Sequence, residues 1–395
     1  MPGGLIRFRR AFWRIVCPFW NPVWLPSSAF SGSLPGRVDR LLGEKYNKGY
    51  ETGFKTEGAN RPYMTSIREV AKLAGVSPAT VSRVMNGTAN VDEKKRQRVL
   101  EAIEKTGFRP NELARALYKK SSRMIGVIVP DIENPFFSEL SKAVEEQAYR
   151  TGYRILLCNS DDDPQKEMMN IQMLVQMKAD GIIITTNCDS TSRVLGDCPI
   201  PVVVVDRKLK GESGTAFIEA DHYKGGRLAA RHLVECGCKN IVCLRGPLAY
   251  SSGRQRYQGY LDICEKYGLK EQYVNCTYDY EAGRRAAGEL MRRFPDTDGI
   301  IACNDMVAIS VYKELTARGR RIPEEIQLIG FDDIKFSRMC TPELTTVSQP
   351  IREMGSLAAG IIIRHVEGEE FLQENVFDVK LVERDTTRRK KEQKK

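Results

Sequence analysis

Two short runs of the sequence combine hydrogen-bonding and aromatic side chains, each directly after an apolar stretch. The run IENPFF holds Asn134, whose amide can bond hydroxyl groups, with Phe136 and Phe137, whose rings can stack on the apolar face of a sugar. The run VVVVDRK holds Asp206 and Arg207, a carboxylate beside a guanidinium that together can bind vicinal hydroxyls. These residue types favour reversible binding of a small neutral polyol, although the two phenylalanines could also belong to a core.

Strand-like runs alternate with amphipathic helical stretches from residue 123 onward, and these elements must position the polar side chains. Strands are expected at Met124–Val129, Arg154–Leu157, Gly181–Thr185, Val202–Val205, Asn240–Leu244, Ile300–Ala302 and Ile326–Ile329. Helices are expected near Phe136–Gly152, Asp163–Met177, Lys224–Cys236, Arg254–Lys266 and Asp305–Arg318. Such alternation predicts parallel sheets covered by helices, which bind ligands beyond the carboxyl ends of their strands. The number of strands suggests two lobes.

The composition limits the class of protein. A chain of 395 residues, with 42% hydrophobic residues and a mean hydropathy of −0.38, is expected to form two or three domains and no transmembrane helix. The eleven cysteines are scattered, which fits reduced thiols, and the C-x-C pair Cys236 and Cys238 has no second pair nearby to complete a metal site. The absence of G-x-S-x-G, P-loop and G-x-G-x-x-G motifs argues against an enzyme, which stays a rival hypothesis.

Two short helices joined by a tight glycine turn are predicted in TSIREVAKLAGVSPATVSRVMNG. Ser66 and Glu69 have the spacing of a capping box, Gly75 ends the first helix, and Ser77 followed by Pro78 begins the second. This is the pattern of a helix-turn-helix, whose second helix enters the major groove of DNA. The apolar residues expected to face inward are Ile67, Val70, Ala71, Ala74, Val81, Val84 and Met85.

A third helix and the local charge support DNA binding. The helix is expected over Asp92–Thr106, with Val99 and Ile103 inward and Gly107 after its end. Residues 65–120 hold twelve lysines and arginines against six acidic residues, a surplus suited to DNA phosphates. A solvated helix face or an ordinary helical hairpin would share some of these signals. The agreement of caps, spacing and charge favours the DNA-binding interpretation.

The runs AGVSPATVSRVMNG and GFRPNELARAL, with the third helix between them, resemble the headpiece and hinge of the lactose-repressor (LacI/GalR) family of bacterial regulators. The resemblance runs without a gap from Ser66 to about Leu117 and covers the rest of the chain except the first sixty-odd residues and the tail. It implies an all-α helix-turn-helix headpiece followed by an α/β, two-lobed sensor with Rossmann-like lobes, similar to periplasmic sugar-binding proteins. It also implies a DNA-binding transcriptional regulator, expected to be a repressor and not an enzyme.

The resemblance assigns DNA contacts to the recognition helix and to the hinge. Pro78 and Ala79 are expected to contact bases through apolar surface, and Arg83 can pair with guanine. Leu117 is expected to wedge into the minor groove beside the same leucine of a second subunit. The expected DNA-binding residues are Ser66, Ser77, Pro78, Ala79, Thr80, Ser82, Arg83, Asn86, Asn111, Ala114, Arg115 and Leu117.

The resemblance also adds ligand contacts from the second lobe. Arg254, Asn304, Asp332 and Gln349 match sugar-contact positions of the family, and Tyr278 matches a position that is often aromatic and closes over the ligand. Any one of these residues could instead serve the fold, for example as a cap. The expected ligand-binding residues are Asn134, Phe136, Phe137, Asp206, Arg207, Arg254, Tyr278, Asn304, Asp332 and Gln349. The Asp206–Arg207 pair and the N-P-F-F run most resemble ribose-type sensors, so the expected effector is a pentose or another sugar. No cofactor and no metal are expected.

Five segments are expected along the chain. They are an unstructured extension or translated upstream region at 1–63, the headpiece at 64–109, the hinge helix and linker at 110–122, the sugar-binding and dimerisation domain at 123–382, and a basic disordered tail at 383–395. An export signal is disfavoured because Arg14 and prolines interrupt the apolar stretch near the start, and Met64 is the expected functional start.

A homodimer in the cytoplasm is expected, because two headpieces on a near-palindromic operator fix half-sites about one helical turn apart. The ligand is expected to change operator affinity through a coupling free energy whose sign the sequence leaves open.

Two alternative functions stay open. A transport binding protein would share the sensor but lack the headpiece, and a global carbon-catabolite regulator would answer to a phosphorylated carrier protein.

Overall fold

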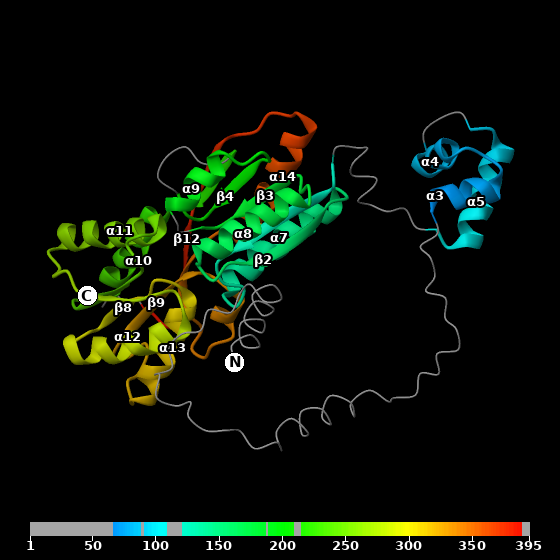
Figure 1. The fold of residues 1–395 in the computed structure, drawn as a ribbon. Helices are drawn as coiled ribbons and strands as arrows, with labels where there is room; N and C mark the ends of the chain where they lie inside the picture. The colour runs from blue at the N-terminus through cyan, green and yellow to red at the C-terminus, as the bar shows by residue number, and fades with distance from the viewer. Residues whose placement is uncertain (1–65, 88–90, 109–120, 187–188, 209–214, 389–395) are drawn as a thin grey trace, which may run out of the picture. The chain divides into compact units, whose positions relative to one another are not determined.

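The structure is a computed structural model that describes residues 66–87, 91–108, 121–186, 189–208 and 215–388 of the chain (Figure 1). The chain divides into two compact units, one ending at Arg109 and the other beginning at Pro110. The expected extension at 1–63 and the hinge residues Asn111, Ala114, Arg115 and Leu117 lie outside the described residues.

The first unit contains the three predicted helices α3 (Ile67–Ala74), α4 (Pro78–Asn86) and α5 (Glu93–Thr106). The capping box of α3 is formed, because the Ser66 hydroxyl accepts the Glu69 N–H at 3.3 Å and Glu69 Oε2 accepts the Ser66 N–H at 2.6 Å. Each helix ends at a glycine in the left-handed region, at φ of about +61° to +63°, a conformation that stops the helix and that glycine adopts without strain. These residues are Gly75, Gly87 and Gly107.

The core of this unit is small and apolar. Its fully buried members are Val70, Ala71, Ala74, Val81, Val84, Val99 and Ala102. Ile67, Met85 and Ile103 are partly buried against it, so the predicted inward faces are confirmed. This packing leaves one face of α4 exposed at Pro78, Ala79 and Arg83, the side expected to meet DNA.

The second unit is a two-lobed α/β structure. The sheet of the first lobe has the order β11-β5-β4-β3-β1-β2, and every neighbouring pair is parallel. Its strands are β1 (Met124–Val129), β2 (Arg154–Asn159), β3 (Gly181–Ile184), β4 (Val202–Val205), β5 (Ala216–Ala220) and β11 (Glu374–Phe377). Its helices are α7 (Pro135–Arg150), α8 (Pro164–Gln176), α9 (Asp189–Gly196) and α14 (Ile351–Glu367).

The second lobe repeats this design with the order β12-β10-β9-β8-β6-β7, in which only the β10–β12 pair is antiparallel among the strands described. Its strands are β6 (Ile241–Arg245), β7 (Tyr273–Asn275), β8 (Gly299–Ile301), β9 (Gln327–Asp332), β10 (Thr345–Ser348) and β12 (Lys380–Val382). Its helices are α10 (His222–Glu235), α11 (Ser251–Tyr267), α12 (Tyr280–Arg293), α13 (Asp305–Ala317) and the short η1 (Lys335–Arg338).

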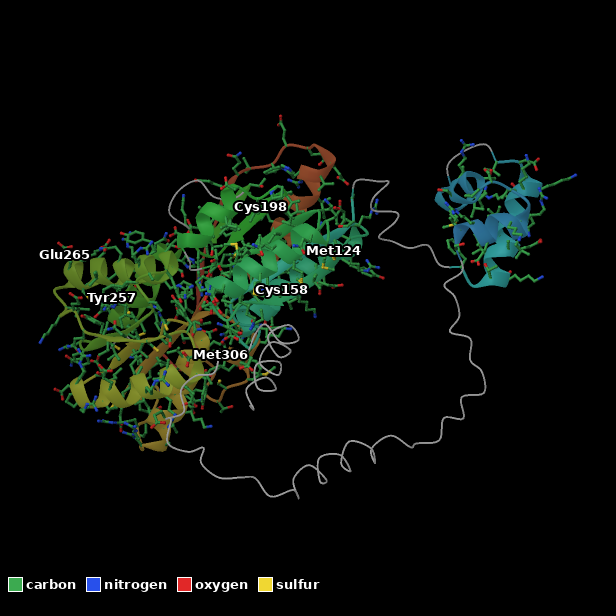
Figure 2. All side chains as sticks on the ribbon, in the orientation of Figure 1. Met124, Cys158, Cys198, Tyr257, Glu265 and Met306 are labelled. Carbon is green, nitrogen blue, oxygen red and sulfur yellow. The ribbon has the colours of Figure 1, made fainter. Side chains whose placement is uncertain are left out.

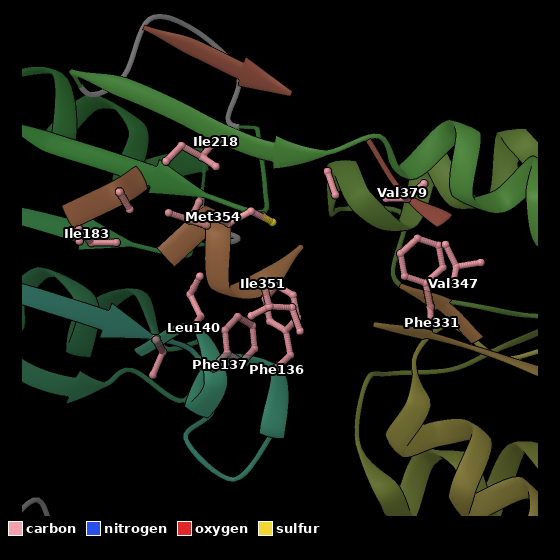
Figure 3. Close-up of a cluster of buried hydrophobic side chains, with 14 of the residues drawn as sticks. Phe136, Phe137, Leu140, Ile183, Ile218, Phe331, Val347, Ile351, Met354 and Val379 are labelled. Carbon is pink, nitrogen blue, oxygen red and sulfur yellow. The ribbon is translucent and has the colours of Figure 1, made fainter. Parts of the chain in front are cut away.

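The predicted fold class is confirmed, and each of the seven predicted strands corresponds to an observed one. The chain passes between the lobes three times, after β5, after β10 and after β11. One buried apolar cluster includes residues of both lobes: Figure 3 shows Phe136 and Phe137 near Ile351 in the first lobe, and Phe331 against Val347 in the second. The carboxyl ends of both sheets therefore meet between the lobes.

The expectation of a disordered tail from residue 383 is wrong for residues 383–388. Thr386 and Thr387 are buried, at 1% and 6% exposure. The Leu328 N–H donates to Thr386 O at 3.0 Å, and the Thr386 hydroxyl returns a bond to Leu328 O at 2.7 Å. The segment belongs to the second lobe because its backbone and hydroxyls satisfy polar groups at the start of β9, a pairing that its charged composition conceals.

Candidate effector cleft and DNA-reading helix

A small cavity lies between the lobes at the carboxyl ends of the strands, with about 20 Å³ of free space in this closed arrangement. Its lining residues are Asn134, Phe136, Phe137, Asp206, Arg207, Ser252, Arg256, Tyr278, Asn304, Asp332 and Gln349. Nine of the ten expected ligand residues are in this set.

The aromatic wall comes from the first turn of α7. Asn134 caps this helix, its Oδ1 accepting the Phe136 N–H at 3.1 Å. Pro135 occupies the first helical position, where its missing N–H costs nothing. The two phenylalanine rings meet edge to face, with centroids 5.1 Å apart and planes at 89°, and both are 3% exposed. Asn134 and both rings therefore serve the fold as well as the cavity.

Asp206 follows β4 in the left-handed region, at φ +72°, and is buried. His222 Nε2 lies 3.2 Å from Asp206 O and 3.5 Å from its Oδ1, while His222 Nδ1 accepts the Arg256 Nε–H at 3.3 Å. Burial and the charge of Arg256 lower the pKa of His222, so the neutral imidazole donates through Nε2. Although burial alone raises the pKa of Asp206, His222, Arg207 and Arg256 bring it to about 2. Asp206 is therefore an anionic acceptor at neutral pH.

Arg207 sits among aromatic rings, with its guanidinium 4.5 Å from the Tyr250 centroid and 5.7 and 5.8 Å from those of Phe137 and Tyr278. It approaches Asp162 at 3.6 Å, and the Tyr250 hydroxyl donates to the same carboxylate at 3.4 Å. Because Asp162 and Arg207 belong to the first lobe and Tyr250 to the second, this group joins the two walls. Such contacts stabilise a closed cleft.

The second lobe supplies a guanidinium and a carboxyl group from α11 and β9. Arg256 donates from Nη1 to Cys303 O at 2.6 Å, and its guanidinium lies 3.6 Å from the centroid of the Phe331 ring and 3.8 Å from Asp332 Oδ1. Gln349 Nε2 donates to Asp332 Oδ1 at 2.7 Å. Burial, with Asp305 and Asp206 nearby, raises the pKa of Asp332 well above its usual range despite Arg256. The cavity thus offers one ionised carboxylate and one carboxyl group that can also donate.

Tyr278 and Asn304 lie on neighbouring loops of the second lobe. The Tyr278 ring stacks on Tyr250, with centroids 6.0 Å apart and planes at 14°, and its hydroxyl is buried without a hydrogen-bond partner among the described residues. Asn304 caps α13 by accepting the Val307 N–H at 2.9 Å, and its Nδ2 donates to Tyr278 O at 3.0 Å. The expected capping role of Asn304 and its position in the cavity are both observed.

The recognition helix α4 presents the expected surface. Ser77 caps it, with Oγ accepting the Thr80 N–H at 3.2 Å, and Pro78 occupies its first turn. Thr80 and Ser82 are partly exposed, and Ser66 is exposed at the start of α3. The Asn86 side chain lies outside the described residues. Exposed donors and apolar groups at the first turns of α4 are what a helix in the major groove requires.

Family models match both units. Residues 66–111 match the model of bacterial regulatory proteins of the lacI family, and residues 122–385 match that of periplasmic binding proteins and the sugar binding domain of the LacI family. The chain belongs to the LacI family. It is accordingly a DNA-binding transcriptional regulator that responds to a sugar, and not an enzyme.

Relatives of this LacI-family chain include the ribose operon repressor of Halalkalibacterium halodurans, 37% identical over 82% of this chain and 98% of the relative. A solved periplasmic binding protein/LacI transcriptional regulator from Alkaliphilus metalliredigens, complexed with D-xylulofuranose, is 34% identical and covers 67% of this chain and 99% of its own, with a TM-score of 0.63. A LacI family transcriptional regulator from Enterococcus faecium with bound ribose is 29% identical, covers 68% and 100%, and has a TM-score of 0.61.

The predicted role of Arg254 in the LacI-family cleft is wrong. Arg254 is exposed, and its Nη1 donates to Leu248 O and Ala249 O, each at 2.8 Å. Ser252 and Arg256 line the cavity instead. They are four residues apart and share one face of α11, whereas Arg254, two positions from each, points to the opposite side of the helix. An apolar stripe at Tyr260 and Ile263, followed back along the helix, would have identified this face.

The described residues contain no cluster of three or more His, Cys, Asp or Glu side chains that could hold a metal ion. None of their helices is long and apolar enough to cross a membrane.

Proposed function

We propose that this LacI-family regulator represses transcription from an operator whose occupancy is controlled by ribose or a closely related pentose. The observation that carries the proposal is the small cavity, in which Asp206 and Arg207 face Arg256 and Asp332 across the cleft beside two phenylalanine rings. Carboxylates and guanidiniums suit the hydroxyls of a sugar, and the rings suit its apolar face. The names of the relatives point to the same class of ligand, because one is a ribose operon repressor and two solved neighbours hold five-carbon sugars.

The enclosure of the cleft favours a monosaccharide. The Tyr250 and Arg207 contacts join its two walls, an arrangement that suits a small ligand better than a disaccharide. No metal and no organic cofactor is required for this binding. We further propose that the protein acts as a cytoplasmic homodimer, because two recognition helices on a near-palindromic site double the base contacts.

Calorimetric titration of the full chain with ribose, xylulose, xylose, glucose and cellobiose tests the ligand class. Ribose or another five-carbon sugar should bind with the lowest Kd. Operator binding, measured by fluorescence anisotropy with and without the sugar that binds, then tests the coupling and gives its sign. A chain that binds no sugar but gains operator affinity from a phosphorylated carrier protein would overturn the proposal.

A further inference from the structure

A second groove lies beside the effector cleft, at the carboxyl ends of β6 and β7 and along α12. Its volume is about 600 Å³ and it opens to solvent. Its lining residues are Arg245, Gly246, Pro247, Leu248, Asn275, Cys276, Thr277, Ala282, Arg285, Ala286 and Glu289. None of these side chains lines the effector cavity, so the proposed function leaves this groove unused.

One guanidinium in the groove is held in a fixed direction. Arg245 donates from Nε and Nη2 to Asn275 Oδ1 at 3.0 and 2.7 Å. Its guanidinium also packs 3.8 Å from the ring centroid of Tyr273 and 4.8 Å from that of Tyr257, which Figure 2 labels in the second lobe. A cation oriented by packing before a ligand arrives loses little entropy when it binds an anion.

The charge balance of the groove is positive. Within the described residues neither Arg245 nor the exposed Arg285 forms a salt bridge. The single carboxylate of the lining, Glu289, binds Arg293 Nη1 at 2.5 Å. Asp279, outside the lining, already accepts the Thr277 hydroxyl and the Ala282 N–H, at 2.5 and 2.8 Å. Two guanidiniums thus face a groove whose one lining carboxylate is paired with Arg293, while Asp279, outside the lining, is close enough to Arg285 for that charge to lower its pKa.

We propose that this groove is a second small-molecule site, which binds the phosphate monoester of a small polyol, such as a sugar phosphate. Paired guanidiniums match the geometry and charge of a phosphate group. Thr277 and Asn275 offer hydrogen bonds to hydroxyls. Pro247, Leu248 and two alanines form the apolar wall that a carbon skeleton contacts.

The groove and the effector cleft share two loops. Gly246 lies so close to Tyr278 that a Cβ at position 246 would be 2.6 Å from the tyrosine hydroxyl oxygen. The loop after β6 continues to Tyr250, which stacks on Tyr278 and contacts Arg207. Thr277, on the second loop, directly precedes Tyr278. A ligand that fixes these loops changes the affinity of the cleft, and by linkage the effector changes the affinity of the groove by the same factor.

Titration of the full chain with ribose 5-phosphate, using Arg285→Gln and Arg284→Gln as a matched pair, tests this site. Both substitutions remove one positive charge from exposed, neighbouring positions of α12, but Arg284 lies outside the lining and pairs with Glu281 at 3.0 Å. Arg285→Gln should raise the Kd for ribose 5-phosphate about tenfold or more, since a charged hydrogen bond to phosphate is lost. Arg284→Gln should leave that Kd unchanged.

Undetectable binding to the unaltered chain at about 10 mM ligand, or equal Kd values in the two variants, would overturn the proposed site. A second measurement compares the Kd for ribose with and without saturating ribose 5-phosphate, and a shift that Arg285→Gln abolishes would support the coupling. This second measurement rests on ribose as the effector, whereas the first does not. Failure of the groove and failure of the proposed effector are therefore distinguishable.

Discussion

Replacing Arg256 by glutamine should weaken both the folded sensor and its hold on a sugar, whereas the same change at Arg254 should do neither. The two arginines are one helical half-turn apart on α11, yet their surroundings differ. Arg256 has a side chain 12% exposed and binds Cys303 O at 2.6 Å. Arg254 is exposed and binds two backbone carbonyls at the surface, where water can replace it.

The magnitude follows from the contacts that Arg256 loses. A hydrogen bond from a charged donor contributes about 1.5–3 kcal/mol, and a desolvated cation over an aromatic ring about 2 kcal/mol. The contact with Asp332 adds little as an ion pair, because the raised pKa of that carboxyl group favours its neutral form. Glutamine retains some hydrogen bonding, so the expected loss in the free energy of unfolding is about 2–4 kcal/mol, against less than about 1 kcal/mol for Arg254→Gln.

Urea unfolding and calorimetry with ribose measure the two effects separately. Arg256→Gln should lower the transition midpoint without changing the slope, and should raise the Kd for ribose at least about tenfold if the guanidinium binds a sugar hydroxyl. Arg254→Gln is the matched control for charge, composition and helix propensity. Equal losses in the two variants, or an unchanged Kd in Arg256→Gln, would refute the assignment of the cavity-facing side of α11.

Three further outcomes follow from the same geometry. Gly330→Ala should destabilise the sensor by about 2–3 kcal/mol in urea unfolding, because its Cβ would lie 2.0 Å from Asp305 Oδ1, and a near-neutral result would contradict this packing. Burial raises the pKa of Glu219 to about 7, and Lys208 opposes this shift only partly. The folded state therefore binds the proton more tightly than the unfolded state, so the free energy of unfolding falls as the pH rises through about 7. The Glu219→Gln variant should lose less stability between about pH 5 and 8, and parallel pH profiles of the two proteins would count against this assignment. Arg83→Ala should weaken operator binding by about 1–3 kcal/mol but random DNA much less in anisotropy titrations, and equal losses would argue against base recognition.

Local signals made most of the fold predictable. Ser66, Ser77 and the three glycines that end the headpiece helices act on their own neighbours, so their effects are visible in sequence. The strands β1 and β4 were predicted with their observed bounds because they are buried apolar runs. The strands β5, β10 and β11 were missed, and so were the three-residue β7 and β12, because short or half-exposed strands carry no such run and exist through pairing with distant segments.

The helices α9, α12 and α14 were also missed. In α12 the inward face is built from alanines and Gly283 rather than large apolar residues, and its arginines mask the period. The site was predictable where residues directly follow strands, as Asp206 and Asn134 do. The site prediction failed at Arg254 because the expected helix began at that residue, three positions after the observed start. The charged residues alone do not show which side of α11 faces the cavity.

The sensor holds its own first residues in a way that suits transmission of a signal. Asp180 accepts the hydroxyl of Ser121 at 2.5 Å, the N–H of Ser122 at 2.8 Å and the N–H of Arg123 at 3.0 Å. Because Asp180 directly precedes β3 and Arg123 directly precedes β1, these bonds fix the start of the sensor to the sheet of the first lobe. Any movement of the first lobe must therefore displace Ser121 with it, rather than being absorbed by a loose connection.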